Sequence, residues 1–483
     1  MSIESSLHRR GFFQHMAGGL CGASLAWLLE REAAGIQHAS PSAPPAFDLK
    51  PRSPHLPVRA RAVIHLFMNG GPSQMDLFDP KPMLDQLHGT DRFQKFAGEI
   101  ENLGSVGTIM RSPFKFAQHG QSGMWMSDAL PHLAQHVDDI AMIRSMQTTN
   151  LTHEPAIYLM QTGKMGPGRP SFGSWVVYGL GSENQNLPAY VVLDDPLGLP
   201  VNGIENWQAG FLPPQFQGTR FRSNGSPVLN LRADVARSAV LEDLERGVLA
   251  GLDRAHQAQR PFQPRLEARI SNYELAARMQ LEATDALDLS QETAATLESY
   301  GLNGEKTESY GRRCLIARRL VERGVRFVQL YINGQIWDNH SGLESGLKQA
   351  CARTDQPIAA LLTDLKQRGL LDETLVIWSS EFGRLPIAQI GAGEDPRTAG
   401  RDHNKNAFCC WLAGAGVKKG GVHGATDDLG FAAVENVVTV PDWHATTLQL
   451  MGLNHEHLFV EMNGLRERMT GVSPARVVRE ILA

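Results

Sequence analysis

Residues 356–383 read QPIAALLTDLKQRGLLDETLVIWSSEFG, and this stretch decides the fold class that we predict for the chain. Apolar residues recur at helical spacing through 356–371, which predicts an amphipathic helix. Residues 372–384 carry a short run of β-branched and aromatic residues, which predicts a buried strand ending near Glu381. A helix that leads into a buried strand is the repeating unit of a mostly parallel sheet.

The same alternation of strand and helix continues on both sides of this stretch. Further strands are predicted in the segments RAVIHLFMNGG (61–71), DDIAMIRSM (138–146), LPAYVVLDD (187–195), GVRFVQLYING (324–334) and AFCCWLAGAG (407–416). We therefore expect an α/β domain over 61–483, a three-layer sandwich with a mostly parallel central sheet and helices on both faces. Residues from about 234 to 300 show only helical patterns, which predicts a helical insertion.

Composition narrows the range of functions. The chain has 483 residues, of which 42% are hydrophobic, so it can bury a large core. Its formal net charge is −5, and no basic segment of the kind that binds nucleic acid is present. The five cysteines form no C-x-x-C pair, and the adjacent Cys409 and Cys410 are poorly placed to bridge each other, so no disulfide framework is predicted.

The N-terminal segment predicts export. Arg9 and Arg10 precede a mildly apolar run from Met16 to Leu29 that is too short and too rich in glycine and alanine for a membrane span. Paired arginines before such a run resemble a twin-arginine signal, which we assign to 1–34, with a proline-rich linker over 35–60. The prediction is a periplasmic or exported bacterial protein; a short amphipathic anchor or a buried helix is the alternative.

Polar residues gather where predicted strands end, which is where open parallel sheets bind ligands. Five groups share this position: Asn69 with Ser73 and Asp76, His153 with Glu154, Asp338 with Asn339 and His340, Glu381 with Arg384, and Arg401 with Asp402, His403 and Lys405. Each group alone also has an ordinary structural explanation, such as a turn, a helix start or an ion pair. Together they indicate a metal-assisted hydrolase of anionic esters.

The expected metal follows from the residue types. Asp338 and His340 are alternate residues of an extended segment, so their side chains are expected to point to the same side. Imidazole together with carboxylate favours Zn, Mn or Fe over Ca or Mg. A divalent cation is therefore the expected cofactor.

Several of these motifs resemble the sulfatases, members of the alkaline-phosphatase-like superfamily. In 356–383, Glu381 occupies the place of a metal-binding Asp of that family, and Phe382 the place of the neighbouring Asn or His. Residues 327–340 resemble the family strand that runs out to a functional His, here His340. The resemblance implies an alkaline-phosphatase-like fold, although Asn69 stands where the first strand normally carries Asp.

The segment HEPAIYLMQTG, residues 153–163, resembles the sulfatase motif whose first residue is the nucleophile, matured to formylglycine. His153 stands at that first position, so the resemblance implies that formylglycine chemistry is absent. Three roles for His153 stay open: metal ligand, general base for a metal-bound water, or covalent nucleophile.

A closer resemblance covers most of the chain. The phrases FMNGGPSQMDLFDPKP (67–82), SPFKFAQHGQSGMWMSDALPHL (112–133), GRPSFGSWVVYGLGSENQNLPAYVVL (168–193) and GRDHNKNAFCCWLAGAG (400–416) are similar to the bacterial family called domain of unknown function 1501. Its members are often labelled sulfatase-like, and no settled activity comes with the name.

Taken together, the motifs and the resemblance predict an exported hydrolase. Its expected substrate is a sulfate or phosphate ester that is carried on a glycan. The expected metal ligands are Asn69, Asp338, His340, Glu381 and His403, and the expected catalytic residues are His153, Arg384 and Lys405. The expected partners are an anionic ester and the twin-arginine export machinery, with no nucleic acid and no membrane span beyond the signal. The alternative is a degenerate relative that binds a glycan or a protein without catalysis.

Overall fold

The computed structural model describes residues 48–91, 98, 100, 105–222, 238–260, 263–390 and 398–483. The predicted signal (1–34) and the first half of the predicted linker (35–60) lie outside these residues. The chain divides into two compact units, Met1–Phe47 with Ala233–Ile270, and Asp48–Arg232 with Ser271–Ala483. The second unit contains the central sheet and the candidate site. None of the helices in the described residues is long and apolar enough to cross a membrane.

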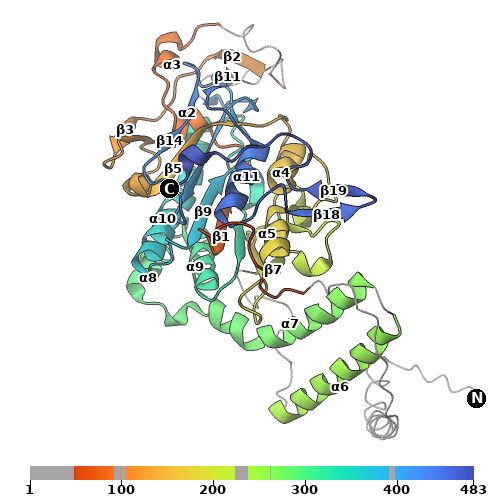
Figure 1. Cartoon of the computed structure of the whole chain (residues 1–483). Coiled ribbons are helices and arrows are strands. Elements are labelled where there is room, and N and C mark those ends of the chain that lie inside the picture. Colours follow the sequence, from red (N-terminus) through yellow and green to blue (C-terminus); the bar gives the residue numbers. More distant parts are fainter. Residues whose placement is uncertain are drawn as a thin grey trace, which may run out of the picture. The chain divides into compact units, whose positions relative to one another are not determined.

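The central sheet has nine strands, in the order β14-β5-β13-β9-β1-β8-β6-β7, with β17 also pairing with β5 (Figure 1). Within the described residues, β13 is antiparallel to both of its neighbours, whereas every other pairing in the sheet is parallel. The strands are β1 (Ala62–Phe67), β5 (Ile140–Gln147), β6 (Tyr190–Leu193), β7 (Thr219–Phe221), β8 (Phe327–Leu330), β9 (Thr374–Ser379), β13 (Phe408–Ala413), β14 (Val422–His423) and β17 (Val438–Thr439).

Shorter two-stranded sheets surround the central one. They consist of β2 (Val106–Ile109) with β11 (Ile387–Gln389), β3 (Phe116–His119) with β4 (Met124–Ser127), β10 (Gly383–Arg384) with β12 (His403–Asn404), β15 (Ala425–Thr426) with β16 (Ala433–Glu435), and β18 (Phe459–Met462) with β19 (Leu465–Arg468). The β10–β12 pair matters most for the site, because it sets Arg384 directly opposite His403.

The helices are α2 (Gln74–Leu77), α3 (Pro82–Leu87), α4 (His153–Thr162), α5 (Phe172–Leu180), α6 (Ala239–Ala258), α7 (Pro264–Leu287), α8 (Ala294–Ser299), α9 (Glu308–Glu322), α10 (Leu343–Gln367) and α11 (Val440–Leu450). Short 3₁₀ turns are η4 (Leu133–Asp139), η5 (Gly203–Trp207), η6 (Pro214–Phe216), η7 (Leu289–Gln291), η8 (Asn333–Gln335) and η10 (Arg479–Ile481).

Helices cover both faces of the sheet, as β1 illustrates. Its alternate residues Ile64 and Leu66 pack in one buried cluster with side chains of α9 and α10. Val63 and Phe67 pack in a second cluster with side chains of α5 and α11. Successive strand residues point to opposite faces, so the two clusters lie on opposite sides of the sheet. Figure 1 shows the helices α9 and α10 on one side of β1 and the helices α5 and α11 on the other. The predicted three-layer α/β fold with a mostly parallel sheet is confirmed.

Helix α10 is longer than the sequence pattern predicted. It begins at Leu343 rather than at Gln356, and it contains Pro357. Proline removes a backbone donor and usually ends or kinks a helix. Here the helix continues because residues on both sides of the proline, among them Leu347 and Leu361, are fully buried against the sheet. Burial of this face outweighs the local cost of the proline.

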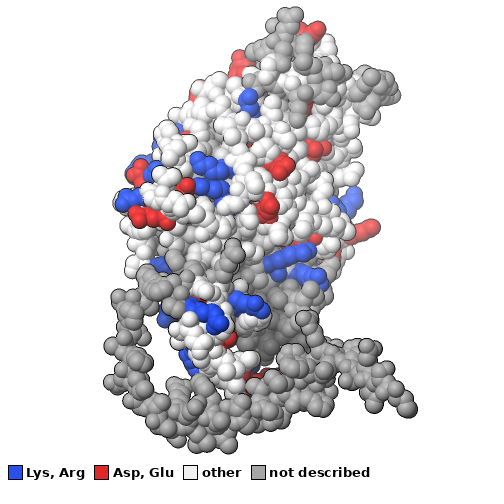
Figure 2. All heavy atoms as spheres, turned by 90° about the vertical axis from the view of Figure 1, so that its right-hand side faces the viewer, with Lys and Arg blue, Asp and Glu red and all other residues white. Residues whose placement is uncertain are grey.

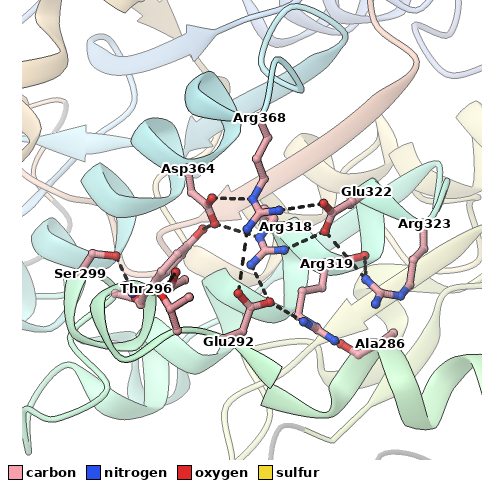
Figure 3. A network of polar contacts seen from close by, with 12 residues as sticks. Ala286, Glu292, Thr296, Ser299, Arg318, Arg319, Glu322, Arg323, Asp364 and Arg368 are labelled. Carbon is pink, nitrogen blue, oxygen red and sulfur yellow. Dashed lines mark hydrogen bonds and ion pairs between the residues drawn. The ribbon is translucent and has the colours of Figure 1, made fainter. Parts of the chain in front are cut away.

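A buried network of ion pairs joins the helices of one outer layer (Figure 3). At its centre, Arg318 of α9 is 1% exposed and lies 2.7 Å from Glu292, 2.7 Å from Glu322 and 2.9 Å from Asp364 of α10. The neighbouring Arg319 donates to the carbonyl oxygen of Ala286 at 2.9 Å. Arg319 pairs with Glu292, and Arg368 pairs with Glu322 and Asp364, so three guanidinium groups balance the three carboxylates.

Surface charge is mixed. On the face shown in Figure 2, the described Lys and Arg side chains occur beside Asp and Glu side chains, and neither sign dominates. This agrees with the net charge of −5.

Candidate metal centre

The candidate site lies at the carboxyl ends of adjacent strands. The segments that follow β1, β8 and β9 carry Asn69, Asp338 and Glu381 respectively, and these three strands are neighbours in the sheet. His153 is the first residue of α4, and His403 belongs to β12. This is the edge of a parallel sheet at which ligands characteristically bind.

Four side chains converge on one point. Ligand atoms of His153, Asp338, His340 and His403 all lie within 4.8 Å of one another. The Nε2 atoms of His340 and His403 lie 3.0 and 3.3 Å from Asp338 Oδ1, and 3.0 Å from each other. His153 Nε2 lies 3.2 Å from Asp338 Oδ2 without the geometry of a hydrogen bond. Three imidazole nitrogens thus surround one carboxylate.

Two of these imidazole rings are held in orientation by a hydrogen bond at Nδ1, the ring nitrogen that faces away from Asp338. His153 Nδ1 lies 2.7 Å from Glu381 Oε1, and His340 Nδ1 lies 2.6 Å from Gln389 Oε1. Because both partners are acceptors, each Nδ1 carries the proton and donates it. Each ring therefore directs its Nε2 into the cluster, and with an ion bound this nitrogen would be the ligand atom, the arrangement typical of metal-ligating histidines.

Glu381 does not lie among the converging ligands. Its side chain is fully buried behind His153, where Oε1 also accepts the Gly70 N–H at 2.7 Å. Its other oxygen lies 2.8 Å from Ser380 Oγ. Both carboxylate oxygens therefore already have partners within the protein, and the geometry fits a residue that orients His153.

Arg384 holds Asp338 in place. It is fully buried and donates to Asp338 Oδ1 at 2.6 Å. Its remaining donors reach the carbonyl oxygens of Gly71 at 2.7 Å, Arg401 at 2.9 Å and Gly70. Because its donors are bound to protein oxygens, Arg384 is placed to hold the structure of the site. It does not present a free guanidinium group to an anion.

Phe382 fills the space between two of the histidines. Its ring centroid lies 4.8 Å from that of His153 and 4.4 Å from that of His403, and the side chain is fully buried. A Cβ atom on Gly71 would lie 2.6 Å from this ring, and Gly71 has φ +70°, so glycine is required there. Phe382 provides a dry apolar wall instead of the ligand that the sulfatase pattern has at this position.

The electrostatics follow from these contacts. Burial alone would lower the pKa of His153, but its contacts with Asp338 and Glu381 raise it to about 9. Burial alone would raise the pKa of Asp338, but its contacts with the three histidines and the charge of Arg384 hold it far below its usual range. The pKa of His403 is lowered, chiefly by burial. The cluster is thus built to keep a carboxylate ionised.

The remaining predicted residues lie around the cluster rather than in it. Asn69 is fully buried, and neither its Oδ1 nor its Nδ2 has a hydrogen-bond partner among the described residues. Lys405 is half-buried in the turn after β12, where its carbonyl oxygen accepts the N–H of Thr148 at 2.9 Å. Arg401 is fully buried and pairs with Asp76 at 2.8 Å. Gln389 was not anticipated, because nothing local to it in the sequence signals a contact with His340.

The residues present fit a transition-metal ion. Three imidazoles and one carboxylate are a donor set suited to Zn, Mn or Fe. The unpartnered polar atoms of Asn69 and the unaligned Nε2 of His153 are what a buried site designed around an ion would contain. The His340 side chain is 36% exposed, whereas that of His403 is 5% exposed, so the cluster opens to solvent on the His340 side.

The chain is similar to several solved structures at low sequence identity. They include the lipoteichoic acid synthase LtaP from Listeria monocytogenes (9% identity, 87% of this chain and 76% of that one, TM-score 0.37) and the PsFucS1 sulfatase from Pseudoalteromonas sp. (12%, 84% and 69%, TM-score 0.34). Alkaline phosphatase from the Antarctic bacterium TAB5 is another (12%, 83% and 100%, TM-score 0.32).

No curated protein shows a significant match to the chain. A family model described as "Protein of unknown function (DUF1501)" matches residues 60–482, which span the described sheet, its helices and every residue of the candidate metal centre. The chain therefore belongs to the DUF1501 family.

Proposed function

We propose that this protein is a metal-dependent hydrolase of sulfate or phosphate esters, with the metal held by His153, Asp338, His340 and His403. The observation that carries the proposal is the convergence of three imidazole Nε2 atoms on the Asp338 carboxylate. A Zn, Mn or Fe ion there supplies Lewis acidity and lowers the pKa of water. The cluster lies at the strand ends and is open to solvent at His340. A substrate can therefore reach it from the solvent.

The protein's own residues have distinct tasks in this proposal. Glu381 orients the His153 ring and offsets its charge, and Gln389 orients the His340 ring. Arg384 fixes the Asp338 carboxylate. Lys405 remains our candidate for binding the anionic group of the substrate.

His153 acts as a ligand in this proposal rather than as a nucleophile. Its Nδ1 is held by Glu381, and its Nε2 is directed at the same carboxylate as the other two histidines. The ester is then cleaved by water, without a covalent enzyme intermediate. This role explains why a histidine stands at the position where the sulfatase motif has its nucleophile.

The test is hydrolysis of 4-nitrophenyl phosphate and 4-nitrophenyl sulfate by protein loaded separately with Zn, Mn or Fe. We expect turnover with at least one ester, and Asp338→Asn should lower kcat/KM by about 100-fold or more, since changes behind the ligands alone cost roughly 10–100-fold. His256→Ala, on the exposed surface of α6, is the matched control and should retain full activity. Turnover that survives both Asp338→Asn and His403→Ala would refute the proposal.

A second candidate function is binding without catalysis. It is favoured by His153, a cluster residue that stands where the resembling sulfatase motif has its nucleophile. It predicts retention of an anionic glycan that survives His153→Ala and Glu381→Ala, together with no turnover of either aryl ester. Measurable turnover excludes it.

We further propose that the protein is exported from the bacterial cytoplasm in a folded state. The support is the pair Arg9-Arg10 ahead of a short apolar run. Export of a folded chain would allow the metal to be loaded before translocation. The substrate would then be an anionic ester of the cell envelope or its surroundings, such as a sulfated or phosphorylated glycan.

A further inference from the structure

A second pocket lies apart from the metal centre and shares no lining residue with it. It has a volume of about 690 Å³, within the ~300–1,000 Å³ of typical small-ligand sites. One wall is formed by the segment from Asp79 to Asp85, and the other by the hairpin of β3 and β4 with the residues just before it. Arg144 of β5 also lines it.

The pocket contains an arginine with one unsatisfied donor, the Nε of Arg144. The Arg144 side chain is only 16% exposed, and its Nε has no hydrogen-bond partner among the described residues. Its charged neighbour is Asp79, with 3.7 Å between Arg144 Nη1 and Asp79 Oδ1. A largely buried N–H donor without a hydrogen bond is costly, and a carboxylate, sulfate or phosphate group can satisfy the guanidinium bidentately.

Positive charge is in excess at this point. Lys81 Nζ lies 3.1 Å from the same Oδ1 atom of Asp79, so one carboxylate faces two cations. The other oxygen of Asp79 accepts the hydroxyl of Thr426. Elsewhere on the lining, Lys115 and Asp85 offset each other. The pocket therefore attracts one negative charge to the neighbourhood of Arg144 and Lys81.

The opposite wall is aromatic. Gln118 pairs with Trp125 across the hairpin, so Trp125 and Phe116, two residues before Gln118, lie on the same face of it. Trp125 is 38% exposed, whereas every other described tryptophan is at least 96% buried. An exposed indole beside a cationic corner provides a flat apolar surface next to an anion site.

We propose that this pocket binds a sugar ring carrying a sulfate, phosphate or carboxylate group. The anion lies on Arg144 and Lys81, and the apolar face of the ring lies on Trp125. Asp85 and Ser112 also line the pocket and supply acceptors for sugar hydroxyls. The carboxylates of Asp79 and Asp85 disfavour a polyanionic ligand such as a nucleotide. The proposal is independent of the function proposed for the metal centre.

Tryptophan fluorescence and calorimetry on the full chain test this site. The probes are galactose 6-sulfate, glucose 6-phosphate and glucuronate, which separate the three anions, with galactose, inorganic sulfate and AMP for comparison. We expect saturable quenching by at least one anionic sugar, with a Kd at least about tenfold below that of every comparison compound. Equal binding by galactose, inorganic sulfate or AMP, or no saturable binding of any anionic sugar, would overturn the proposal.

Variants assign the binding to this pocket. Arg144→Gln should weaken binding at least about tenfold, whereas Arg466→Gln, at an exposed arginine of β19, should not change it. Trp125→Phe should remove the fluorescence response while calorimetric binding persists, and Trp125→Ala should weaken binding. His340→Ala should leave binding intact, which separates this site from the metal centre. Unchanged affinity in folded Arg144→Gln protein would contradict the assignment.

Discussion

At the scale of single residues, the proposed metal binding depends on which nitrogen of each imidazole ring is hydrogen-bonded to a side-chain oxygen. His153 and His340 each have Nδ1 held by a carboxylate or amide oxygen, so each ring presents Nε2 to Asp338. Glu381 is important because it fixes the proton of His153 at Nδ1. A residue that never touches the metal can in this way control its affinity.

Replacing Glu381 with Gln should weaken metal binding by roughly 10–100-fold, because the amide holds the His153 ring less firmly and no longer offsets its charge. Titration of the metal against a competing chelator measures this. Glu373→Gln serves as the control, since Glu373 is more than half exposed and pairs with Arg61 on the surface. Equal affinities for Glu381→Gln and wild type would remove Glu381 from the site.

A histidine outside the metal centre should control acid stability. His65 of β1 is fully buried; Gln329 Nε2 donates to its Nδ1 at 3.2 Å, and its Nε2 lies 2.7 Å from Ser379 Oγ. Burial, with the nearby His444, lowers its pKa from 6.5 to about 3. The unfolded chain therefore binds a proton below pH 6.5 that the folded chain does not bind until about pH 3.

The resulting stability is fully present above pH 6.5 and is lost progressively as the pH falls toward 3. Each pH unit within this window should cost about 1.4 kcal/mol of unfolding free energy from His65. Urea unfolding at pH 7.0, 6.0 and 5.0 measures the slope. His65→Leu should flatten it whatever its effect on stability at pH 7, and an unchanged slope would show that His65 does not contribute.

At the scale of helices and strands, the sheet positions the site and the outer helices hold the sheet. Arg318 of α9 lies among Glu292, Glu322 and Asp364, which ties α9 to α10 and to the chain before them (Figure 3). These helices cover the face of the sheet formed by Ile64 and Leu66 of β1. Loss of the network should loosen this layer without touching the metal ligands.

Arg318→Ala should lower the free energy of unfolding by about 3–5 kcal/mol, because it leaves three carboxylates without their shared cation. Arg312→Ala is the matched control on the same helix. Arg312 pairs with Glu308 in an i,i+4 contact about one-third exposed, for which we expect no more than about 1 kcal/mol. Similar losses in the two variants, measured by chemical denaturation, would contradict this reading of the network.

The sequence predicts those features of the fold and the site that depend on residues close together in the chain. The strand at 372–384 and its neighbours were predictable, because buried β-branched runs and their strand-end polar residues are local patterns. Asp338 and His340 could be paired for the same reason. By contrast, the partners of Arg384 are carbonyl groups of residues 70, 71 and 401, which only the folded chain brings together.

The place of Glu381 could not be read from the sequence for a similar reason. Whether a strand-end carboxylate faces the ion or the histidine beside it depends on the approach of Gly70 and α4. Gln389 approaches His340 from a short sheet with β2, nearly fifty residues further along the chain. Motifs therefore located the site, and packing determined the role of each residue.

At the scale of the whole molecule, one α/β unit combines the metal centre with a separate cationic and aromatic pocket. The matched family model spans both. In our proposals the first site breaks an anionic ester and the second binds an anionic sugar. Both functions suit a protein that works on glycans outside the cytoplasm.

Changing Arg9 and Arg10 together to Lys should retain the protein in the cytoplasm of its host, because the twin-arginine pathway reads the arginine pair. Cell fractionation with a cytoplasmic marker measures this. Arg59 and Arg61 changed together to Lys provide a control outside the signal, which should fractionate as wild type does. Export that persists without the arginine pair would exclude this route.

The central claim is that His153, Asp338, His340 and His403 form a metal centre. Elemental analysis of protein purified from its native host tests it most directly, with His340→Ala and His256→Ala treated identically. We expect about one Zn, Mn or Fe ion per chain in wild type and His256→Ala, and much less in His340→Ala. Correctly folded wild-type protein without metal, or a metal content unchanged by His340→Ala together with His403→Ala, would contradict the account.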